Sequence, residues 1–325
     1  MDLNLDFAPK LFDPRRKPLR PSPAGLAREQ VPLPKAGRVY VYTSDIVLAV
    51  NAALATRRPL LVMGPPGTGK STLAQHIARH LGWRFYQRVI TSRTQAQDLL
   101  WTFDAVRRLR DAQSGGRIRN DAAYVQPQLL WWALNPTSAA RRGGAATKGI
   151  PRAKDPAEKA PERHAVVLLD EIDKADPDIP NDLLGPLGDE AFEVTDIQKV
   201  ITREEDRRLL LVITSNDERE LSPAFVRRCI LLTLRPHGRE RLVEIAEEHF
   251  PGKDTKLFTE IAVQVVEDRD RAAREGARPP STAEYLDAVA ACLRLGLRPD
   301  SPAWAGLSTL ILSKFQSASP ESEAF

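Results

Sequence analysis

The feature that most constrains the fold is a glycine-rich run, Gly-Pro-Pro-Gly-Thr-Gly-Lys-Ser, at positions 64–71. It matches the pattern GxxxxGK[ST], in which glycines let successive backbone N–H groups turn inward around phosphate oxygens. A short apolar run at 60–63 precedes it, and a helical pattern follows from Ser71 to His80. Because such a loop leaves a buried strand and enters a helix whose N-terminus faces the phosphate, it predicts an α/β fold that binds a nucleotide.

The side chains of this loop have distinct expected roles. Lys70 would place its ammonium group against the β- and γ-phosphates, and the hydroxyl of Ser71 would ligate Mg²⁺. A chance glycine-rich turn, the alternative, does not explain both the strand before the loop and the helix after it. The predicted nucleotide-binding residues are Gly64, Pro65, Pro66, Gly67, Thr68, Gly69, Lys70, Ser71 and Thr72.

A second signal is a pair of acids, Asp170 and Glu171, directly after the continuous apolar run at 165–169. Such a run is typical of a strand that is buried on both faces of a parallel sheet. In enzymes with this loop, the first acid supports the Mg²⁺ shell and the second polarises the attacking water. Asp173 and Asp176 follow, and we expect them to be surface charges or helix caps.

Another apolar run, at 209–214, leads to Asn216. Ligands of open α/β sheets gather at the carboxyl ends of strands, so Asn216 would lie beside the γ-phosphate and orient the water; an ordinary turn residue is the alternative. A Ser-Pro pair then opens a short helix that ends in Arg227 and Arg228. One of these is expected to be an arginine finger for a neighbouring subunit's nucleotide. A solvated surface pair is the alternative, and the sequence does not choose between the two arginines.

The alternation of strands and helices predicts a doubly wound parallel sheet of five strands. Residues 95–134 read as helical, with an apolar stripe through Leu99, Leu100, Phe103 and Val106. Beyond Pro236 only helical patterns remain, which predicts a second, smaller, all-helical domain. The predicted organisation is a proline-rich arm over 1–37, an α/β domain over 38–236 with a mobile insertion at about 135–163, a helical lid over 237–315 and a polar tail over 316–325.

Composition bounds the partners and the compartment. The net charge is only +4, which is weak support for a nucleic-acid partner. Cys229 and Cys292 are far apart and lack metal-ligand spacing, so we expect two reduced thiols. The sequence shows neither a secretory signal nor an apolar stretch of about 20 residues, so we expect a cytoplasmic protein without a membrane span.

Taken in order, these elements resemble the AAA+ ATPases over roughly residues 38–315, and within them the MoxR-like branch, in the same larger clade as the motor subunit of McrBC restriction systems. Residues 91–104 are similar to its helix-2 insertion, 170–175 to its extended Walker B segment, and 215–221 to its sensor 1 loop. The resemblance implies ATP and Mg²⁺ as cofactors, Asn216 as sensor 1, and a hairpin before sensor 1 that follows residues 189–194. It also implies a homo-oligomer in the form of a hexameric ring, a von Willebrand factor A-domain partner and a protein client. The family's sensor 2 arginine has no clear counterpart, because Ser281 or a neighbour stands at its position, just after Arg278.

The leading hypothesis is therefore an ATP-driven motor that remodels a protein client. ATP is the expected nucleotide because the sequence lacks an NKxD-type guanine signature. The first alternative is a motor of a nucleic-acid-processing or defence system, in which Arg107, Arg108 and Arg110 would contact phosphates; a solvated helix face explains these arginines equally well. The second alternative is a nucleotide-gated scaffold with slow hydrolysis, which the intact Glu171 disfavours.

Overall fold

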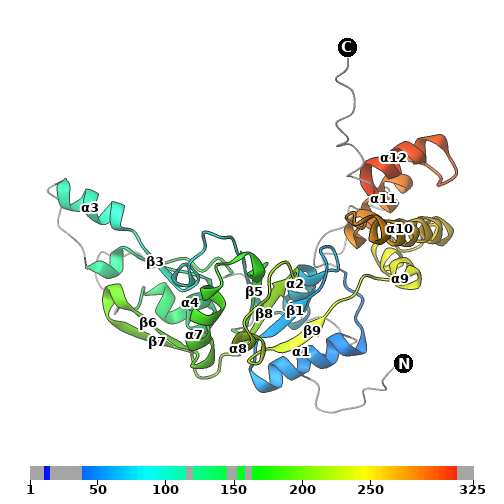
Figure 1. Cartoon of the computed structure of the whole chain (residues 1–325). Helices are drawn as coiled ribbons and strands as arrows, with labels where there is room; N and C mark the ends of the chain where they lie inside the picture. Colours follow the sequence, from blue (N-terminus) through cyan, green and yellow to red (C-terminus); the bar gives the residue numbers. More distant parts are fainter. Residues whose placement is uncertain (1–10, 15–38, 115–119, 145–151, 158–162, 313–325) are drawn as a thin grey trace. The chain divides into compact units, whose positions relative to one another are not determined.

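The computed structural model describes residues 11–14, 39–114, 120–144, 152–157 and 163–312 (Figure 1). The chain forms two compact units. The first comprises residues 1–20, 42–63 and 74–233, and the second comprises residues 21–41, 64–73 and 234–325. Within the described ranges, no helix combines the length and the apolar character that crossing a membrane requires.

A parallel sheet of five strands forms the centre of the first unit, in the order β2-β5-β8-β1-β9. Every residue of β5 is buried, and alternate residues pack on opposite faces of the sheet. Val167 and Leu169 join a core cluster with Trp131, whereas Val166 and Leu168 are buried outside that cluster. The predicted doubly wound parallel sheet is thus confirmed. Its strands are β1 (Leu60–Met63), β2 (Arg84–Val89), β5 (Ala165–Asp170), β8 (Leu209–Ser215) and β9 (Ile230–Thr233).

Short helices surround this sheet. The first begins at Ser44, directly after Thr43, which caps it by accepting a hydrogen bond from the Ile46 amide. The first four residues of α2 belong to the second unit. The α-helices before β9 are α1 (Ser44–Thr56), α2 (Lys70–Leu81), α3 (Ala105–Gln113), α4 (Leu129–Leu134), α5 (Pro136–Ala140), α6 (Asp178–Asp182), α7 (Leu184–Gly188) and α8 (Pro223–Val226). The 3₁₀ turns are η1 (Ala96–Leu99), η2 (Asp121–Ala123), η3 (Ile172–Lys174) and η4 (Thr195–Ile197).

Two antiparallel pairs of strands lie outside the main sheet. β3 (Trp101–Phe103) pairs with β4 (Val125–Pro127), so the helix predicted over 95–134 is wrong in this stretch. The apolar spacing there imitates a helical stripe, but cross-strand hydrogen bonds to residues more than 20 positions away decide the structure. β6 (Ala191–Val194) pairs with β7 (Lys199–Thr202), which confirms the hairpin expected after residues 189–194.

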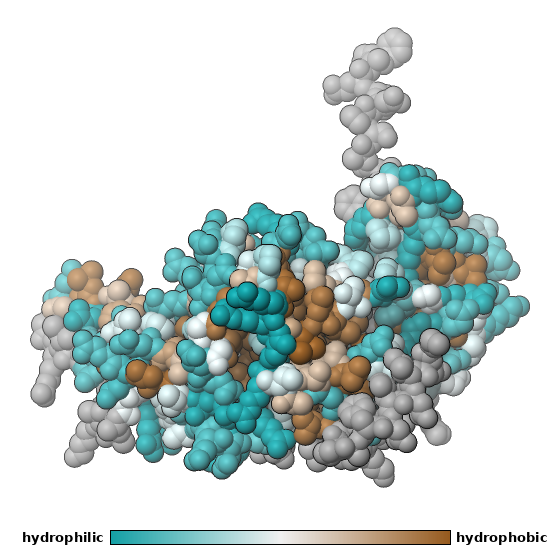
Figure 2. Space-filling view, turned by 60° about the horizontal axis from the view of Figure 1, so that its bottom comes forward, coloured by the Kyte–Doolittle hydropathy of each residue, from teal (hydrophilic) through white to brown (hydrophobic). Residues whose placement is uncertain are grey.

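Helix α3 follows β3 and buries none of its residues. Its apolar side chains Val106 and Leu109 are 69% and 59% exposed. Figure 2 shows apolar patches of this kind set within a mostly hydrophilic surface. Helix α3 therefore presents an apolar surface that no described residue covers.

Residues 11–14 are the described part of the predicted N-terminal arm, and they pack against α1 and α2. The Asn51 side chain accepts hydrogen bonds from the Leu11 and Phe12 amides and donates one to the Phe12 carbonyl. Phe12 is only 1% exposed and meets the rings of Tyr42 and His80 at 5.3 Å. The rest of the arm lies outside the described residues.

Part of the predicted insertion at 135–163 is ordered, since it begins with α5, whose N-terminus Asn135 caps. Farther along, Asp155 accepts hydrogen bonds from Arg84 at 2.5 Å and from the Tyr86 hydroxyl at 3.0 Å, which attaches the insertion to β2. Residues 145–151 and 158–162 are outside the described ranges.

The C-terminal part of the second unit is entirely helical over its described residues, as predicted for the lid. Its core includes Phe258 and Tyr285, and the Tyr285 hydroxyl donates to the Phe258 carbonyl at 3.1 Å. The predicted polar tail lies outside the described residues. The helices are α9 (Arg239–His249), α10 (Thr255–Glu275), α11 (Thr282–Leu295) and α12 (Pro302–Leu312).

Candidate functional site

The glycine-rich loop leaves β1 after Met63 and reaches the N-terminus of α2 at Lys70. Gly64 and Gly67 have φ angles of 141° and 76°, which L side chains rarely adopt. A Cβ atom on Gly64 would lie 2.2 Å from the Leu234 carbonyl oxygen, and one on Gly67 would lie 2.2 Å from Cβ of Ser281. Only glycine fits at these two positions, so the loop has the backbone form that surrounds phosphate oxygens.

Lys70 is buried within this loop, with only 7% of its surface exposed. Its ammonium donates to the carbonyl oxygens of Gly64 at 2.6 Å and Pro65 at 2.9 Å. The charge is thus held over the loop by neutral acceptors, which anionic phosphate oxygens would outcompete. The N-terminus of α2 adds its partial positive charge at the same place.

A cavity of about 300 Å³ opens beside the loop within the second unit. Burial, together with the nearby Arg241 and Arg269, lowers the pKa of His237 to about 4, so this ring is neutral at pH 7. An apolar cavity with a few polar groups suits a planar base and a ribose. Apart from the residues of the glycine-rich loop, no motif in the sequence marks the lining of this cavity. The lining is Val39, Tyr40, Val41, Gly67, Thr68, Gly69, Thr72, His237, Ile245, His249, Thr282, Ala283, Leu286 and Asp287.

In the first unit, Asp170 and Glu171 meet at the hydroxyl of Thr214. This hydroxyl donates to Oδ1 of Asp170 at 2.6 Å and accepts from the Glu171 amide at 2.9 Å. Asp170 is buried at the end of β5, and Glu171 has a φ of 63° that turns the chain sharply away from the strand. Sequence reasoning gave Thr214 no role, although it stands in the run that leads to Asn216.

The carboxylate of Glu171 is partly exposed and forms an ion pair with Lys174, with 2.8 Å between Oε2 and Nζ. The hydrogen bond to Glu171 is the main cause that raises the pKa of Lys174. Lys174 is the last residue of η3 and Glu171 directly precedes this turn, so the carboxylate of Glu171 lies near the surface.

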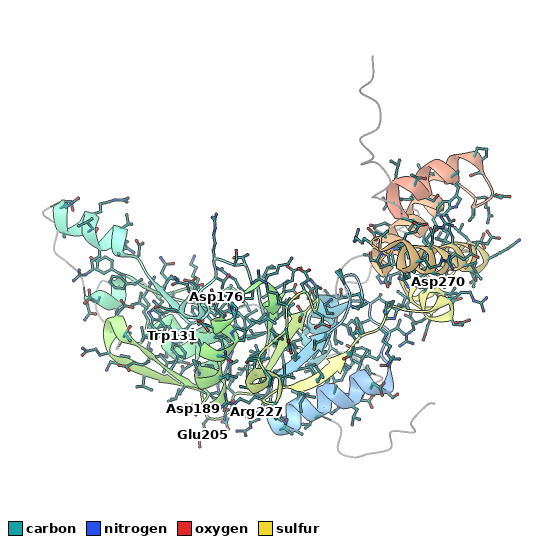
Figure 3. The ribbon with its side chains drawn as sticks, viewed as in Figure 1. Trp131, Asp176, Asp189, Glu205, Arg227 and Asp270 are labelled. Atoms are coloured by element: carbon teal, nitrogen blue, oxygen red, sulfur yellow. The ribbon has the colours of Figure 1, made fainter. Side chains whose placement is uncertain are left out.

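Asp173 corrects a prediction, because it is not a surface charge. It is 2% exposed, and its Oδ2 accepts from the amides of Asn216 and Glu218, each at 3.0 Å. Asp176, labelled in Figure 3, is an exposed charge, as expected, and accepts a hydrogen bond from the Asp178 amide. The side chain of Asn216 makes a long contact of 3.4 Å with Glu218.

The two candidate finger arginines lie elsewhere in the first unit. Ser222 caps α8 as predicted, and Arg227 and Arg228 follow that helix directly before β9. Because β9 starts in register with the start of β1, both arginines lie at the amino edge of the sheet, whereas Asp170 ends β5 at the carboxyl edge. Figure 3 shows Arg227 at that edge. The structure therefore does not bring them to the carboxylates of the same chain.

Arg58 holds the backbone of this arginine loop. Its guanidinium donates to the carbonyl oxygens of Arg227 and Arg228, the latter at 3.0 Å. Cys229 follows them and is a buried free thiol, as is Cys292, which agrees with the predicted reduced thiols. Sequence reasoning missed Arg58, because nothing local links it to residues about 170 positions away.

Comparison with known proteins assigns the chain to a family. The family model described as AAA domain (dynein-related subfamily) matches residues 59–229, more than half of the 325 residues. The chain belongs to this family. The match confirms the AAA+ ATPase predicted from the sequence, and a long alignment with Protein NorQ of Paracoccus denitrificans supports the MoxR-like type.

Individual relatives cover this AAA+ chain unequally. Protein NorQ of Paracoccus denitrificans is 26% identical over 240 residues, which span 71% of this chain and 67% of NorQ. Midasin of Giardia intestinalis is 38% identical over 80 residues, or 23% of this chain and 2% of midasin. Shikimate kinase of Photobacterium profundum is 36% identical over 70 residues, or 21% of this chain and 37% of the kinase. The chain thus spans well under two thirds of midasin and of shikimate kinase.

Among solved structures, a RuvB mutant from Thermotoga maritima aligns with a TM-score of 0.40 and 17% identity. The alignment covers 78% of this chain and 63% of RuvB.

Proposed function

We propose that this chain binds Mg-ATP at residues 64–72 and hydrolyses its terminal phosphoanhydride bond. The observation that carries the proposal is the network at the carboxyl edge of the sheet, where the Thr214 hydroxyl joins Asp170 to the amide of Glu171. β8, which carries Thr214, lies between β5 and β1, and the chain passes from β1 directly into the glycine-rich loop. The loop and the acids each follow the carboxyl end of a strand, where open α/β sheets bind their ligands.

In this proposal, each residue has one task. Lys70 and the loop amides bind the phosphates, and the oxygen ligands Ser71 and Asp170 suit Mg²⁺, which would neutralise charge on the phosphates. Glu171 accepts the proton of the attacking water, and Asn216 orients that water. Glycine positions that exclude any Cβ and a pair of hard oxygen donors are what this nucleotide and metal require.

The test of hydrolysis uses Glu171→Gln with Glu205→Gln as the control, because Glu205 is an exposed acid of the same unit, labelled in Figure 3. Glu171→Gln should bind an ATP analogue normally and lose at least about 100-fold in turnover, the usual contribution of a general base. Glu205→Gln should keep full turnover. Undiminished hydrolysis by Glu171→Gln would reject the catalytic assignment.

We further propose that the chain acts in an oligomeric ring, in which Arg227 or Arg228 completes the site of the next subunit. The position of both arginines at the amino edge, away from their own chain's acids, supports action across an interface. Mixing Arg227→Ala or Arg228→Ala subunits with Lys70→Ala subunits should restore part of the activity, since some interfaces would then pair an intact loop with an intact arginine. No recovery in either mixture would favour a surface pair.

The output we propose is remodelling of a protein client, with a von Willebrand factor A-domain protein as partner. Helix α3 supports a protein rather than a nucleic acid as the client, because it exposes Val106 and Leu109. Two of its arginines already have contacts, since Arg108 pairs with Asp121 at 2.9 Å and Arg107 lies over the Tyr124 ring. Turnover stimulated by DNA or RNA, with binding that weakens steeply as salt rises, would instead support the nucleic-acid motor.

A further inference from the structure

Asp173 is a buried carboxylate whose environment is incomplete. Its Oδ2 accepts two backbone hydrogen bonds, but its Oδ1 is buried and has no hydrogen-bond partner among the described residues. A buried carboxylate oxygen without a partner is costly. The two backbone amides from which Oδ2 accepts must therefore account for an acid at this position.

The bonds of Asp173 are long-range, which distinguishes it from an ordinary cap. They reach the amides of Asn216 and Glu218, 43 and 45 residues away in sequence. Asp176 shows the contrast, because its carboxylate is exposed and accepts only from the amide of Asp178 two residues on. Asp173 thus accepts its hydrogen bonds from the loop after β8 rather than from its own turn.

The two amides converge on one oxygen because the loop between them is bent. Asp217, which separates Asn216 from Glu218, has a φ of 64°. Alternation of right- and left-handed backbone conformations directs nearby N–H groups toward a common anion. Asp173 supplies that anion, and the bend that positions Asn216 depends on it.

The backbone of Asp173 belongs to the turn that directly follows the proposed base, Glu171. Asp173 is the second residue of η3, which follows Glu171 directly, and its neighbour Ile172 is buried. Thr214 joins the same two segments from the strand side through its bond to the Glu171 amide. The segments that carry Glu171 and Asn216 are thereby tied at two points.

We propose that Asp173 is a positioning residue for hydrolysis, which sets the place of Asn216 relative to Glu171 so that both side chains reach the same water. This rests on the proposed function, because it assigns Asp173 to the same site. Asp173 touches neither nucleotide nor water in this scheme and acts through the backbone of Asn216. Its loss should lower kcat and leave nucleotide affinity unchanged, since none of the phosphate-binding residues depends on it.

The test compares Asp173→Ala with Asp173→Asn, and uses Asp176→Asn as the control. Asp173→Ala removes the acceptor and should reduce kcat by at least about tenfold, with the Kd of a fluorescent ATP analogue unchanged within about twofold. Asp173→Asn keeps an oxygen that can face both amides, so it should recover most of the lost turnover. Equal turnover in Asp173→Ala and the wild type would overturn the proposal, and so would a parallel loss of nucleotide affinity.

A double-mutant cycle with Asn216→Ala separates positioning from a general structural effect. If Asp173 acts through Asn216, the double variant should turn over no more slowly than Asn216→Ala alone, within about twofold. Multiplying losses would contradict the proposal. If Asp173→Ala does not fold, as judged by circular dichroism, the same cycle is run with Asp173→Leu, which fills the site without an acceptor, and the same two outcomes decide.

Two reference variants distinguish a failure of the Asp173 proposal from a failure of the proposed function. Lys70→Ala and Glu171→Gln should each abolish hydrolysis. If both retain turnover, the nucleotide site itself is misassigned. If both lose turnover while Asp173→Ala keeps it, only the role of Asp173 is wrong.

Discussion

Replacing Thr214 by valine tests the network that joins β5 to β8. The side chain is fully buried, and valine keeps its shape and its preference for strands while removing the hydroxyl. The change deletes a 2.6 Å bond to Asp170 and leaves the Glu171 amide without its 2.9 Å acceptor. A bond to a charged group contributes about 1.5–3 kcal/mol and a stranded buried donor costs about 1–3 kcal/mol, so after partial relaxation we expect a loss of about 2–4 kcal/mol.

Urea unfolding followed by tryptophan fluorescence measures this loss. In a Trp304→Phe background the remaining tryptophans all lie in the unit that contains the sheet, so the signal reports that unit alone. Thr233→Val is the control, because it makes the same change at an exposed position of β9. Hydrolysis should fall together with stability for Thr214→Val only. A change in unfolding free energy within about 0.5 kcal/mol of the control would refute the reasoning, since that is the range of ordinary surface substitutions.

Three further predictions concern other parts of the chain. Phe12→Ala should lower the unfolding free energy of the first unit by about 3 kcal/mol in urea, whereas Leu11→Ala, at a residue that is 40% exposed, should change it little. Equal effects of the two substitutions would contradict the proposal that Phe12 anchors residues 11–14. Gly67→Ala should weaken binding of an ATP analogue at least about tenfold with an unchanged circular dichroism spectrum, because its Cβ would collide with Ser281; normal affinity would show that the loop adapts. Burial lowers the pKa of His76 to about 4, so between pH 6.5 and 4 the unfolded chain binds a proton at this residue and the folded chain does not, and the unfolding free energy falls as the pH falls. His76→Gln should flatten this pH dependence of the unfolding free energy in urea titrations, and an unchanged dependence would assign it to other groups.

The sequence predicted those parts of the fold that are encoded locally. The apolar runs that became β1, β5 and β8 are continuous, and the glycine-rich loop between a strand and a helix allows few alternatives. The polar residues at the ends of these strands could be placed for the same reason, because parallel strands bring their carboxyl ends to one edge.

The missed features depend on partners distant in sequence. The pairing of β3 with β4 could not be read from spacing, because residues 99–106 also fit a helical stripe. The burial of Asp173 depends on amides 43 and 45 residues away, and an isolated acid after a strand is usually a surface group. The hydrogen bond from Arg58 to the carbonyl oxygen of Arg228 could not be predicted either, because the two residues are also far apart in sequence.

The left-handed backbone of Glu171 has an evolutionary consequence. A φ of 63° is unfavourable for a residue with a Cβ, and such positions cost on the order of 1 kcal/mol or more relative to glycine. Folding alone would therefore favour glycine or asparagine at position 171, and only the need for a long carboxylate opposes that drift. Related chains that have lost hydrolysis and kept the fold should accumulate those two residues here, so the amino acid at this one position would serve as a record of whether a lineage still depends on turnover.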